Sequence, residues 1–389
     1  MNPTDQPAAD NPQQTTRSRP TNGLLYCSIL LLCFLAVLGG IELPPPSAQA
    51  DPPIPTPSPY CPNTPTPTPS ATQVPYSCRP CGQTPTPTVP PDETPIPTHY
   101  QKDGHGTLAW QAYTPTPAPP PGTLPPGIVL VHGAGWHAGD SHETNGEAAD
   151  LAKAGYYVVS VNYELAPCGV IPNQQCHADD DTTPGWWVQR EIQDVEAFVT
   201  AFRDSGLVDP NKVGMVGGSA GASLVAYVAL DTTDTQGAWP YWNASVRPVC
   251  VVMLSGAYDL SDRIPPEGLT TMDPHAILDI ENFTQTNNPA LQRRWSPVYY
   301  LENLSGSFVP MFLIHSDYDP TLPRHQLDDM MCSLESKGIS TDLYKVLVIW
   351  YSDLHSFSYW QSCDQLPFGG GPCTEVRQDV IAYLDAYLK

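Results

Sequence analysis

The sequence predicts an α/β fold with a mostly parallel central sheet and helices on both faces. Two observations support this prediction. Short apolar, β-rich runs alternate with helix-compatible runs from residue 99 to residue 389, and such alternation is typical of a parallel sheet that is covered on both sides. The residues capable of chemistry follow directly after the apolar runs, as expected for a site at the carboxyl ends of parallel strands.

The expected elements follow from the period and length of the apolar runs. Strands are expected at 107–113, 128–132, 157–162, 213–217, 249–254, 311–315 and 343–350. Helices are expected at 143–154, 186–204, 221–230, 323–337 and 374–388. Two further stretches, 167–187 and 239–295, are interpreted as insertions that carry substrate choice. These stretches contain the aromatic residues Trp186, Trp187, Trp239, Tyr241 and Trp242. Their rings either stack on sugar or phenolic rings of a substrate or pack beneath the loops. For any single ring we favour packing.

Residues 1–50 have the features of a targeting segment. A polar start with Arg17 and Arg19 precedes an apolar run at 23–41, and a small-residue cleavage site follows at 48–50. This order is typical of a signal peptide. The run is also long enough to span a membrane, so a retained signal anchor that tethers the protein through residues 23–41 is the alternative.

Residues 51–98 form a Pro/Thr-rich linker, and 31 of the 47 prolines precede Gly127. Such a segment lacks the apolar side chains that would pack a core, and it is expected to extend by about 3.1 Å per residue as a semi-rigid spacer. A spacer suits a tethered enzyme, whereas the cleavage site favours release. Both alternatives place a catalytic domain at 99–389, secreted or anchored to the outer face of the cytoplasmic membrane.

Cysteine content agrees with an oxidising compartment. The chain has eleven cysteines, and the pairs Cys168/Cys176 and Cys363/Cys373 could close short disulfide loops there. Cys250 lies in a buried-strand pattern and Cys332 in a helix pattern, where free thiols behave as small apolar residues.

The chain is strongly acidic, with a formal net charge of −23. This charge disfavours nucleic acid and anionic membranes as partners and suits neutral or cationic substrates. We identify no metal-binding cluster and no nucleotide-binding loop, so no cofactor is expected.

Residues 217–221, Gly-Gly-Ser-Ala-Gly, follow a β-rich run and precede a helical one. In that context G-x-S-x-G predicts a tight turn that presents Ser219 as a nucleophile at the top of a sheet. The alternative is a glycine-rich turn that carries a solvated serine.

A His-Gly-rich loop follows the apolar run that ends near His132. Acyl transfer needs backbone amides directed at the oxygen that becomes negative, and we assign this oxyanion hole to the amides of Gly133, Ala134 and Ala220. An ordinary turn is the alternative. His132 is expected to brace this loop through a hydrogen bond.

The remaining members of a catalytic triad are expected later in the chain. Asp317 and Asp319 both follow the apolar run at 309–314, and His355 follows the last β-rich run. The order Ser219, aspartate, His355 is the Ser…Asp…His order of one hydrolase fold and not that of chymotrypsin or subtilisin. His315 is interpreted as a structural residue at a strand end, and His137 and His142 are given no role.

These motifs resemble the α/β-hydrolase superfamily, and within it the hormone-sensitive-lipase-like carboxylesterases and the acetyl or feruloyl esterase-like branch. The matching strings are His-Gly-Ala-Gly-Trp at 132–136, Gly-Asp at 139–140, Val-Asn-Tyr-Glu-Leu-Ala-Pro at 161–167 and Val-Asp-Pro-Asn-Lys-Val at 208–213. The resemblance favours Asp319 over Asp317, because an aspartate four residues after the histidine and before a Pro-containing turn is usual in that fold.

Three residues depart from the family pattern: Ala134 replaces a glycine, Glu164 an arginine, and Gly218 an acidic residue. The resemblance implies a serine hydrolase that cleaves carboxylic esters through an acyl-enzyme intermediate, either acyl groups on carbohydrates or small aliphatic esters. The N-terminal segment leads us to expect that it acts outside the cytoplasm. The alternatives are a peptidase of the prolyl-oligopeptidase type and a catalytically silent binding module.

Overall fold

The structure is a computed structural model that describes residues 109–166, 184–230, 247–263, 271–363 and 374–389. The chain divides into two units, Met1–Ile54 and Pro55–Lys389, and every described residue belongs to the second. The predicted targeting segment at 1–50 and the linker at 51–98 therefore lie outside the described residues. Among the described helices, none is both long and apolar enough to cross a membrane.

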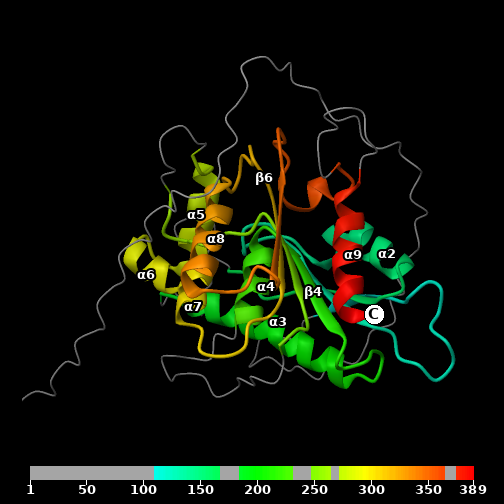
Figure 1. The fold of residues 1–389 in the computed structure, drawn as a ribbon. Coiled ribbons are helices and arrows are strands. Elements are labelled where there is room, and N and C mark those ends of the chain that lie inside the picture. Colours follow the sequence, from blue (N-terminus) through cyan, green and yellow to red (C-terminus); the bar gives the residue numbers. More distant parts are fainter. Residues whose placement is uncertain (1–108, 167–183, 231–246, 264–270, 364–373) are drawn as a thin grey trace, which may run out of the picture. The chain divides into compact units, whose positions relative to one another are not determined.

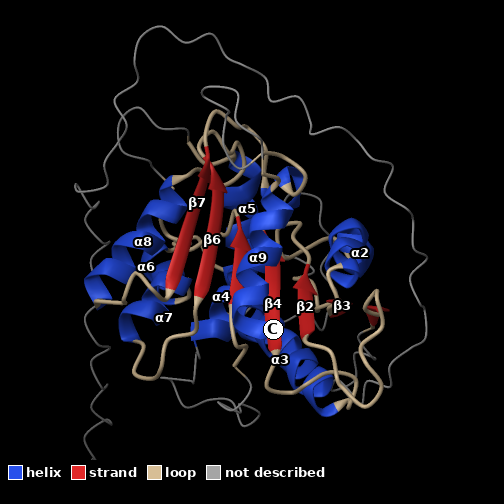
Figure 2. Ribbon diagram, turned by 45° about the vertical axis from the view of Figure 1, so that its right-hand side comes forward, coloured by secondary structure: helices blue, strands red, loops and turns tan. Residues whose placement is uncertain are grey.

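A seven-stranded sheet forms the centre of the described part, in the order β1-β3-β2-β4-β5-β6-β7 (Figure 2). Its strands are β1 Trp110–Tyr113, β2 Gly127–Val131, β3 Tyr157–Val161, β4 Val213–Gly218, β5 Val251–Leu254, β6 Met311–Ser316 and β7 Tyr344–Ile349. Only the β1–β3 pair is antiparallel within this sheet. The predicted mostly parallel sheet is thus confirmed.

The sheet is buried on both faces because alternate side chains of each strand enter different cores. In β2, Val129 and Val131 belong to one hydrophobic cluster, whereas Ile128 and Leu130 belong to the other. This explains why the strand sequence is continuously apolar rather than alternating.

Helices cover both faces of the sheet (Figure 1). On one side lie α3 Trp186–Asp204, α4 Ala220–Leu230, α5 Pro274–Thr284, α7 Pro297–Asn303 and α8 His325–Lys337. On the other lie α2 Asn145–Lys153 and α9 Val376–Leu388. The short elements are η1 Ser141–Thr144, α6 Pro289–Arg294 and η3 Ser356–Tyr359.

Three of these helices, α5, α6 and α7, lie in or just after the stretch that the sequence analysis left as an insertion. Each begins with proline at its first turn, after Asp273, Asn288 and Ser296 respectively. A capping residue followed by proline is a recognised helix-start signal, so this local pattern could have predicted all three.

The structure places some of the predicted surface and thiol residues. Trp187 is only 5 % exposed and Trp186 packs against the same core, so these two rings pack rather than stand free. Trp239, Tyr241 and Trp242 lie outside the described residues, as do Cys168, Cys176 and Cys373, and the disulfide pairing stays a prediction. Cys250 is a buried free thiol, as expected. Cys332 is disulfide-bonded, so the expectation of a free thiol at that position is wrong.

Candidate active site

Ser219 occupies a sharp turn between β4 and α4. Its φ is +54°, in the left-handed region that L-residues rarely adopt. The turn is held because the Ser219 amide donates a hydrogen bond of 2.8 Å to the carbonyl oxygen of Leu254, at the end of β5. The strand-to-helix context predicted for this serine is therefore present.

Close packing explains the glycines around Ser219. A Cβ at Gly217 would overlap the carbonyl of Gly221, and a Cβ at Gly221 would overlap the carbonyls of Val131 and His132. Hydrogen is the only substituent that fits at these positions. The first turn of α4 thereby lies directly against the end of β2, from which the His-Gly-rich loop departs.

That loop passes beside the serine. A Cβ built on Gly133 would lie 3.0 Å from Cβ of Ser219, and Ala134 has a φ of +68°. Both residues line the same pocket as Ser219, whereas Ala220 follows the serine at the first position of α4. Within the described ranges, the amides of Gly133, Ala134 and Ala220 donate no hydrogen bond.

His132 and Tyr163 contact the His-Gly-rich loop and hold its backbone. The His132 ring stacks on Tyr163 with centroids 4.4 Å apart, and its Nδ1 lies 3.1 Å from the carbonyl oxygen of Gly133. The Tyr163 hydroxyl donates to the carbonyls of His132 and Gly133, at 3.1 Å and 2.9 Å. Burial lowers the pKa of His132 to about 4, so the ring is neutral. The predicted brace is confirmed.

The structure brings Asp319 and His355 together. Nδ1 of His355 lies 2.9 Å from Oδ1 and 2.8 Å from Oδ2 of Asp319, and the carboxylate is fully buried. Asp317 lies elsewhere in the loop, where its Oδ1 accepts a hydrogen bond of 3.0 Å from the Ser352 amide. Of the two candidate carboxylates, Asp319 is therefore the one that is hydrogen-bonded to His355.

Several donors keep Asp319 ionised. Burial by itself would raise its pKa, but the hydrogen bond from His355 and the neighbouring histidine charges lower it below the ordinary value. The amides of Thr321 and Leu322 each donate to Oδ1 at 3.0 Å. His315 is fully buried nearby, with Nε2 2.7 Å from the Leu322 carbonyl oxygen, which fits the predicted structural role.

The loop after β7 is fastened in several places. Its His355 amide donates to the Ser358 hydroxyl at 3.0 Å. The Ser356 amide donates to Ser255 Oγ at 3.2 Å, and this oxygen is 3.1 Å from the Tyr359 hydroxyl. These contacts fix the backbone from which the His355 ring projects.

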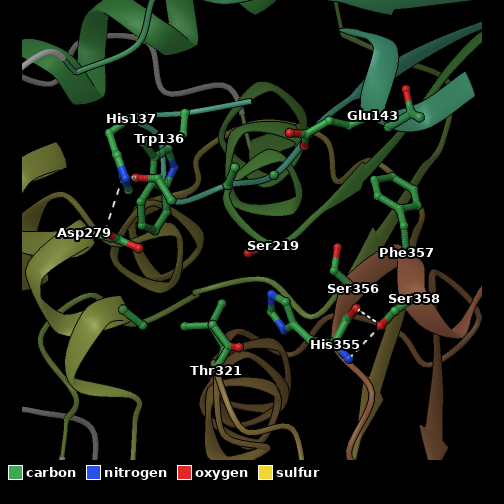
Figure 3. Close-up of a pocket in the computed structure, with 17 residues that line it drawn as sticks. Trp136, His137, Glu143, Ser219, Asp279, Thr321, His355, Ser356, Phe357 and Ser358 are labelled. Carbon is green, nitrogen blue, oxygen red and sulfur yellow. Dashed lines mark hydrogen bonds and ion pairs between the residues drawn. The ribbon is translucent and has the colours of Figure 1, made fainter. Parts of the chain in front are cut away.

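Ser219 and His355 line one pocket of about 470 Å³. The His355 ring is directed toward Ser219 across this pocket (Figure 3). Among the described residues, no hydrogen bond joins Ser219 Oγ to His355. Such bonds are often long before substrate binds and tighten in the complex.

Several pocket residues were not assigned to the site by the sequence analysis, and the polar ones include His137, Glu143, Asp279 and Thr321. His137, to which the sequence analysis gave no role, lies with Nδ1 3.3 Å from Oδ1 of Asp279. Asp279 comes from α5, in the unassigned insertion, and nothing local in the sequence indicated that this helix reaches the site.

The structure also accounts for two departures from the family pattern. Glu164 forms an ion pair of 2.9 Å with Arg190, so the substituted position keeps an ionic partner of opposite sign. A Cβ at Gly218 would overlap Oγ of Ser356 and lie 2.6 Å from the Phe357 ring. An acidic side chain before Ser219 therefore has no room here.

The mostly parallel sheet, the sharp turn that carries Ser219, and the chain order Ser219, Asp319, His355 together define a protein of the α/β-hydrolase fold. Residues 116–334, more than half of the chain, match the family BD-FAE. The chain belongs to the BD-FAE family.

Two curated relatives come from Mycobacterium tuberculosis (strain ATCC 25618 / H37Rv). Esterase LipQ is 25 % identical over 232 residues, which is 58 % of this chain and 50 % of LipQ. The probable carboxylic ester hydrolase LipM is 25 % identical over 205 residues, 52 % of this chain and 43 % of LipM. The chain thus spans about half the length of these curated relatives.

Solved structures share the fold. Thermogutta terrifontis esterase 2 phosphonylated by sarin is 18 % identical with a TM-score of 0.52, and the match covers 75 % of this chain and 92 % of that one. The butyrate-bound form of the same esterase is 18 % identical with a TM-score of 0.50, and covers 75 % of this chain and 94 % of that one.

Proposed function

We propose that this protein is a serine hydrolase that cleaves carboxylic esters through an acyl-enzyme intermediate. The observation that carries the proposal is the convergence of Ser219 and His355 on one pocket, with Asp319 hydrogen-bonded to the remote nitrogen of the histidine. The names of the two curated relatives, an esterase and a probable carboxylic ester hydrolase, add support.

In the proposed reaction Nε2 of His355 accepts the proton of Ser219 Oγ as this oxygen attacks the ester carbonyl. Asp319 accepts the hydrogen bond from Nδ1–H, which selects the tautomer with a free Nε2 and stabilises the imidazolium that forms. His355 then protonates the leaving alcohol. In the second half-reaction it activates a water that releases the acid and restores Ser219.

The negative oxygen of each tetrahedral intermediate is held by the amides of Gly133, Ala134 and Ala220. Preorganised donors of this kind typically contribute a few kcal/mol each to the transition state. Tyr163 donates to the carbonyls of His132 and Gly133, which supports the backbone of the loop from which two of these amides come.

For substrates we propose small aliphatic esters or acyl groups carried on carbohydrates. A cavity of about 470 Å³ is within the range of small-molecule sites. A structural relative of the same fold binds butyrate, which supports a short acyl chain.

We propose that the enzyme acts outside the cytoplasm, either secreted or tethered by residues 23–41. The basic flank, the apolar run and the small-residue site at 48–50 support this proposal, as does a disulfide-permissive cysteine content. Fractionation of cells with antibody detection, together with N-terminal sequencing of the mature protein, separates release from anchorage; a cytoplasmic full-length chain would contradict both.

A fluorophosphonate probe tests the chemistry directly. We expect stoichiometric labelling at Ser219, hydrolysis of short-chain nitrophenyl esters, and loss of both in Ser219→Ala. Hydrolysis of a peptide amide in preference to the ester would favour the peptidase reading. A folded wild-type protein that neither reacts with the probe nor turns over esters would favour the silent binding module.

A further inference from the structure

One carboxylate in the pocket takes no part in the proposed triad. Asp279 extends from α5 into the cavity, and its side chain is 21 % exposed (Figure 3). The carboxylate lies against the backbone of Gly135 in the oxyanion loop, so closely that a Cβ on Gly135 would overlap Oδ2. Asp279 therefore contacts the loop whose amides are proposed to bind the oxygen of the reacting carbonyl.

Asp279 is poorly compensated by the protein. Among the described residues, the one side-chain group within ion-pair distance of its carboxylate is Nδ1 of His137, 3.3 Å from Oδ1. That same nitrogen lies 3.0 Å from the carbonyl oxygen of Gly135, so a neutral His137 shares one N–H between two acceptors. A carboxylate offers about four acceptor sites, and the shared N–H of His137 satisfies at most one of those on Asp279.

None of the described lining residues carries a permanent positive charge. These residues include no lysine and no arginine, and Glu143 adds a second carboxylate to the wall. The whole chain carries a formal charge of −23, which raises the local concentration of cations at the surface.

We propose that Asp279 forms a cation subsite, and that the enzyme prefers esters carrying a positively charged group over neutral esters of the same shape. This inference rests on the proposed ester hydrolysis at Ser219. An ion partly withdrawn from water gains more from an opposite charge than an exposed one does, so a bound ammonium group would supply the counter-charge that His137 provides only when protonated.

The protonation of Asp279 is consistent with this role. Burial raises the pKa of Asp279 to about 6, against the opposing effect of His137 and His275 and with a further increase from Asp273. The carboxylate is thus ionised at neutral pH and loses its charge as the pH falls below about 6.

The test compares pairs of esters that differ only in charge. Butyrylcholine is compared with 3,3-dimethylbutyl butyrate, which places the cation on the alcohol side. The ethyl ester of 4-(trimethylammonio)butanoate is compared with that of 5,5-dimethylhexanoate, which places it on the acyl side. The readout is the ratio of kcat/KM for the charged ester to that for the neutral one.

We expect a ratio above one in at least one pair, and a fall of about tenfold or more in Asp279→Asn. Asparagine keeps the size of the side chain and one acceptor oxygen but removes the negative charge. A preference that depends on shape or on hydrogen bonding alone would therefore survive this substitution. Asp279→Glu should retain the preference. Asp342→Asn, which removes an exposed carboxylate just before β7, is the matched control and should keep the wild-type ratio.

Equal ratios in the wild type and Asp279→Asn would overturn the cation subsite while leaving the hydrolase intact. Failure of the wild type to hydrolyse any of the four esters would instead count against the proposed function, and the subsite would fall with it. If Asp279→Asn does not fold, the wild-type ratio decides: it should decrease as salt is raised from about 0.02 M to about 0.5 M, and a salt-independent ratio contradicts the proposal.

Discussion

Both carboxylate oxygens of Asp319 lie within hydrogen-bonding distance of a single nitrogen, Nδ1 of His355, at 2.9 Å and 2.8 Å. The two residues come from loops that follow adjacent strands, β6 and β7. Since parallel neighbours end at the same edge of the sheet, two side chains 36 positions apart meet there. This contact fixes which nitrogen of His355 remains free to face Ser219.

We predict that Asp319→Asn lowers kcat for a short-chain ester by about 10³- to 10⁴-fold with little change in KM. The amide cannot stabilise the imidazolium that forms when Ser219 loses its proton. Asp317→Asn is the control, because its oxygen can still accept from the Ser352 amide; its kcat should stay within a few-fold of wild type. Steady-state kinetics on both variants, with circular dichroism to verify folding, checks the assignment, and a larger loss for Asp317→Asn would reverse it.

Gly218 is predicted to tolerate no side chain. In Gly218→Ala the new methyl group meets Ser356 and the Phe357 ring, which should cost about 1–3 kcal/mol of stability and displace the loop that carries His355. Gly146→Ala is the matched control, because a Cβ at Gly146 in α2 meets nothing within 4 Å and alanine is the better helix former by about 1 kcal/mol. Urea unfolding and esterase turnover should separate them; a fully active, stable Gly218→Ala would show that the loop yields freely.

Much of this arrangement could be predicted from sequence because it is local. Each strand is marked by an apolar run, and the chemistry-bearing residues follow the strand ends in chain order. Ser219 and His355 could therefore be selected without coordinates, whereas Asp319 was preferred over Asp317 only through the family resemblance. The bounds of α3 match the expected 186–204. The catalytic roles themselves remain predictions.

What sequence could not supply depends on tertiary packing. Asp279 reaches the cavity because α5 packs over the site, and no periodicity in its own segment encodes that position. The glycine at 218 is explained by Ser356 and Phe357, which lie far along the chain. Conversely, α5–α7 were missed although their capping signals are local, because the segment was treated as one insertion.

Ala134 adopts a φ of +68° in the loop that supplies oxyanion donors. An L-residue in this region typically carries about 1–2 kcal/mol of strain, which glycine does not. We therefore predict that Ala134→Gly is neutral or more stable by up to about 1 kcal/mol, after allowance for the extra entropy of the unfolded chain. Its kcat should be retained, because the amide donor persists. Thermal unfolding and ester kinetics check this, and marked destabilisation would mean that the Ala134 methyl makes a packing contact that outweighs the strain.

His132 should make stability depend on acidity. Burial lowers its folded pKa to about 4, whereas an unfolded histidine titrates near about 6.5. Between these values the unfolded chain binds a proton that the folded chain does not, so stability falls as the pH drops below about 6.5, and the loss is complete below about pH 4. From pH 7 to pH 5 this one group should remove about 2 kcal/mol.

The variant His132→Asn removes that titration while its side-chain amide can still donate to the Gly133 carbonyl. Although the loss of the ring stack on Tyr163 should destabilise it at pH 7, its deficit relative to wild type should shrink by about 2 kcal/mol at pH 5. Urea unfolding of both proteins at the two pH values measures this double difference, in which the other titrating groups cancel. A deficit that stays constant would mean that His132 becomes protonated in the folded protein as readily as in the unfolded chain, and that the neutral ring beneath the oxyanion loop has been assigned incorrectly.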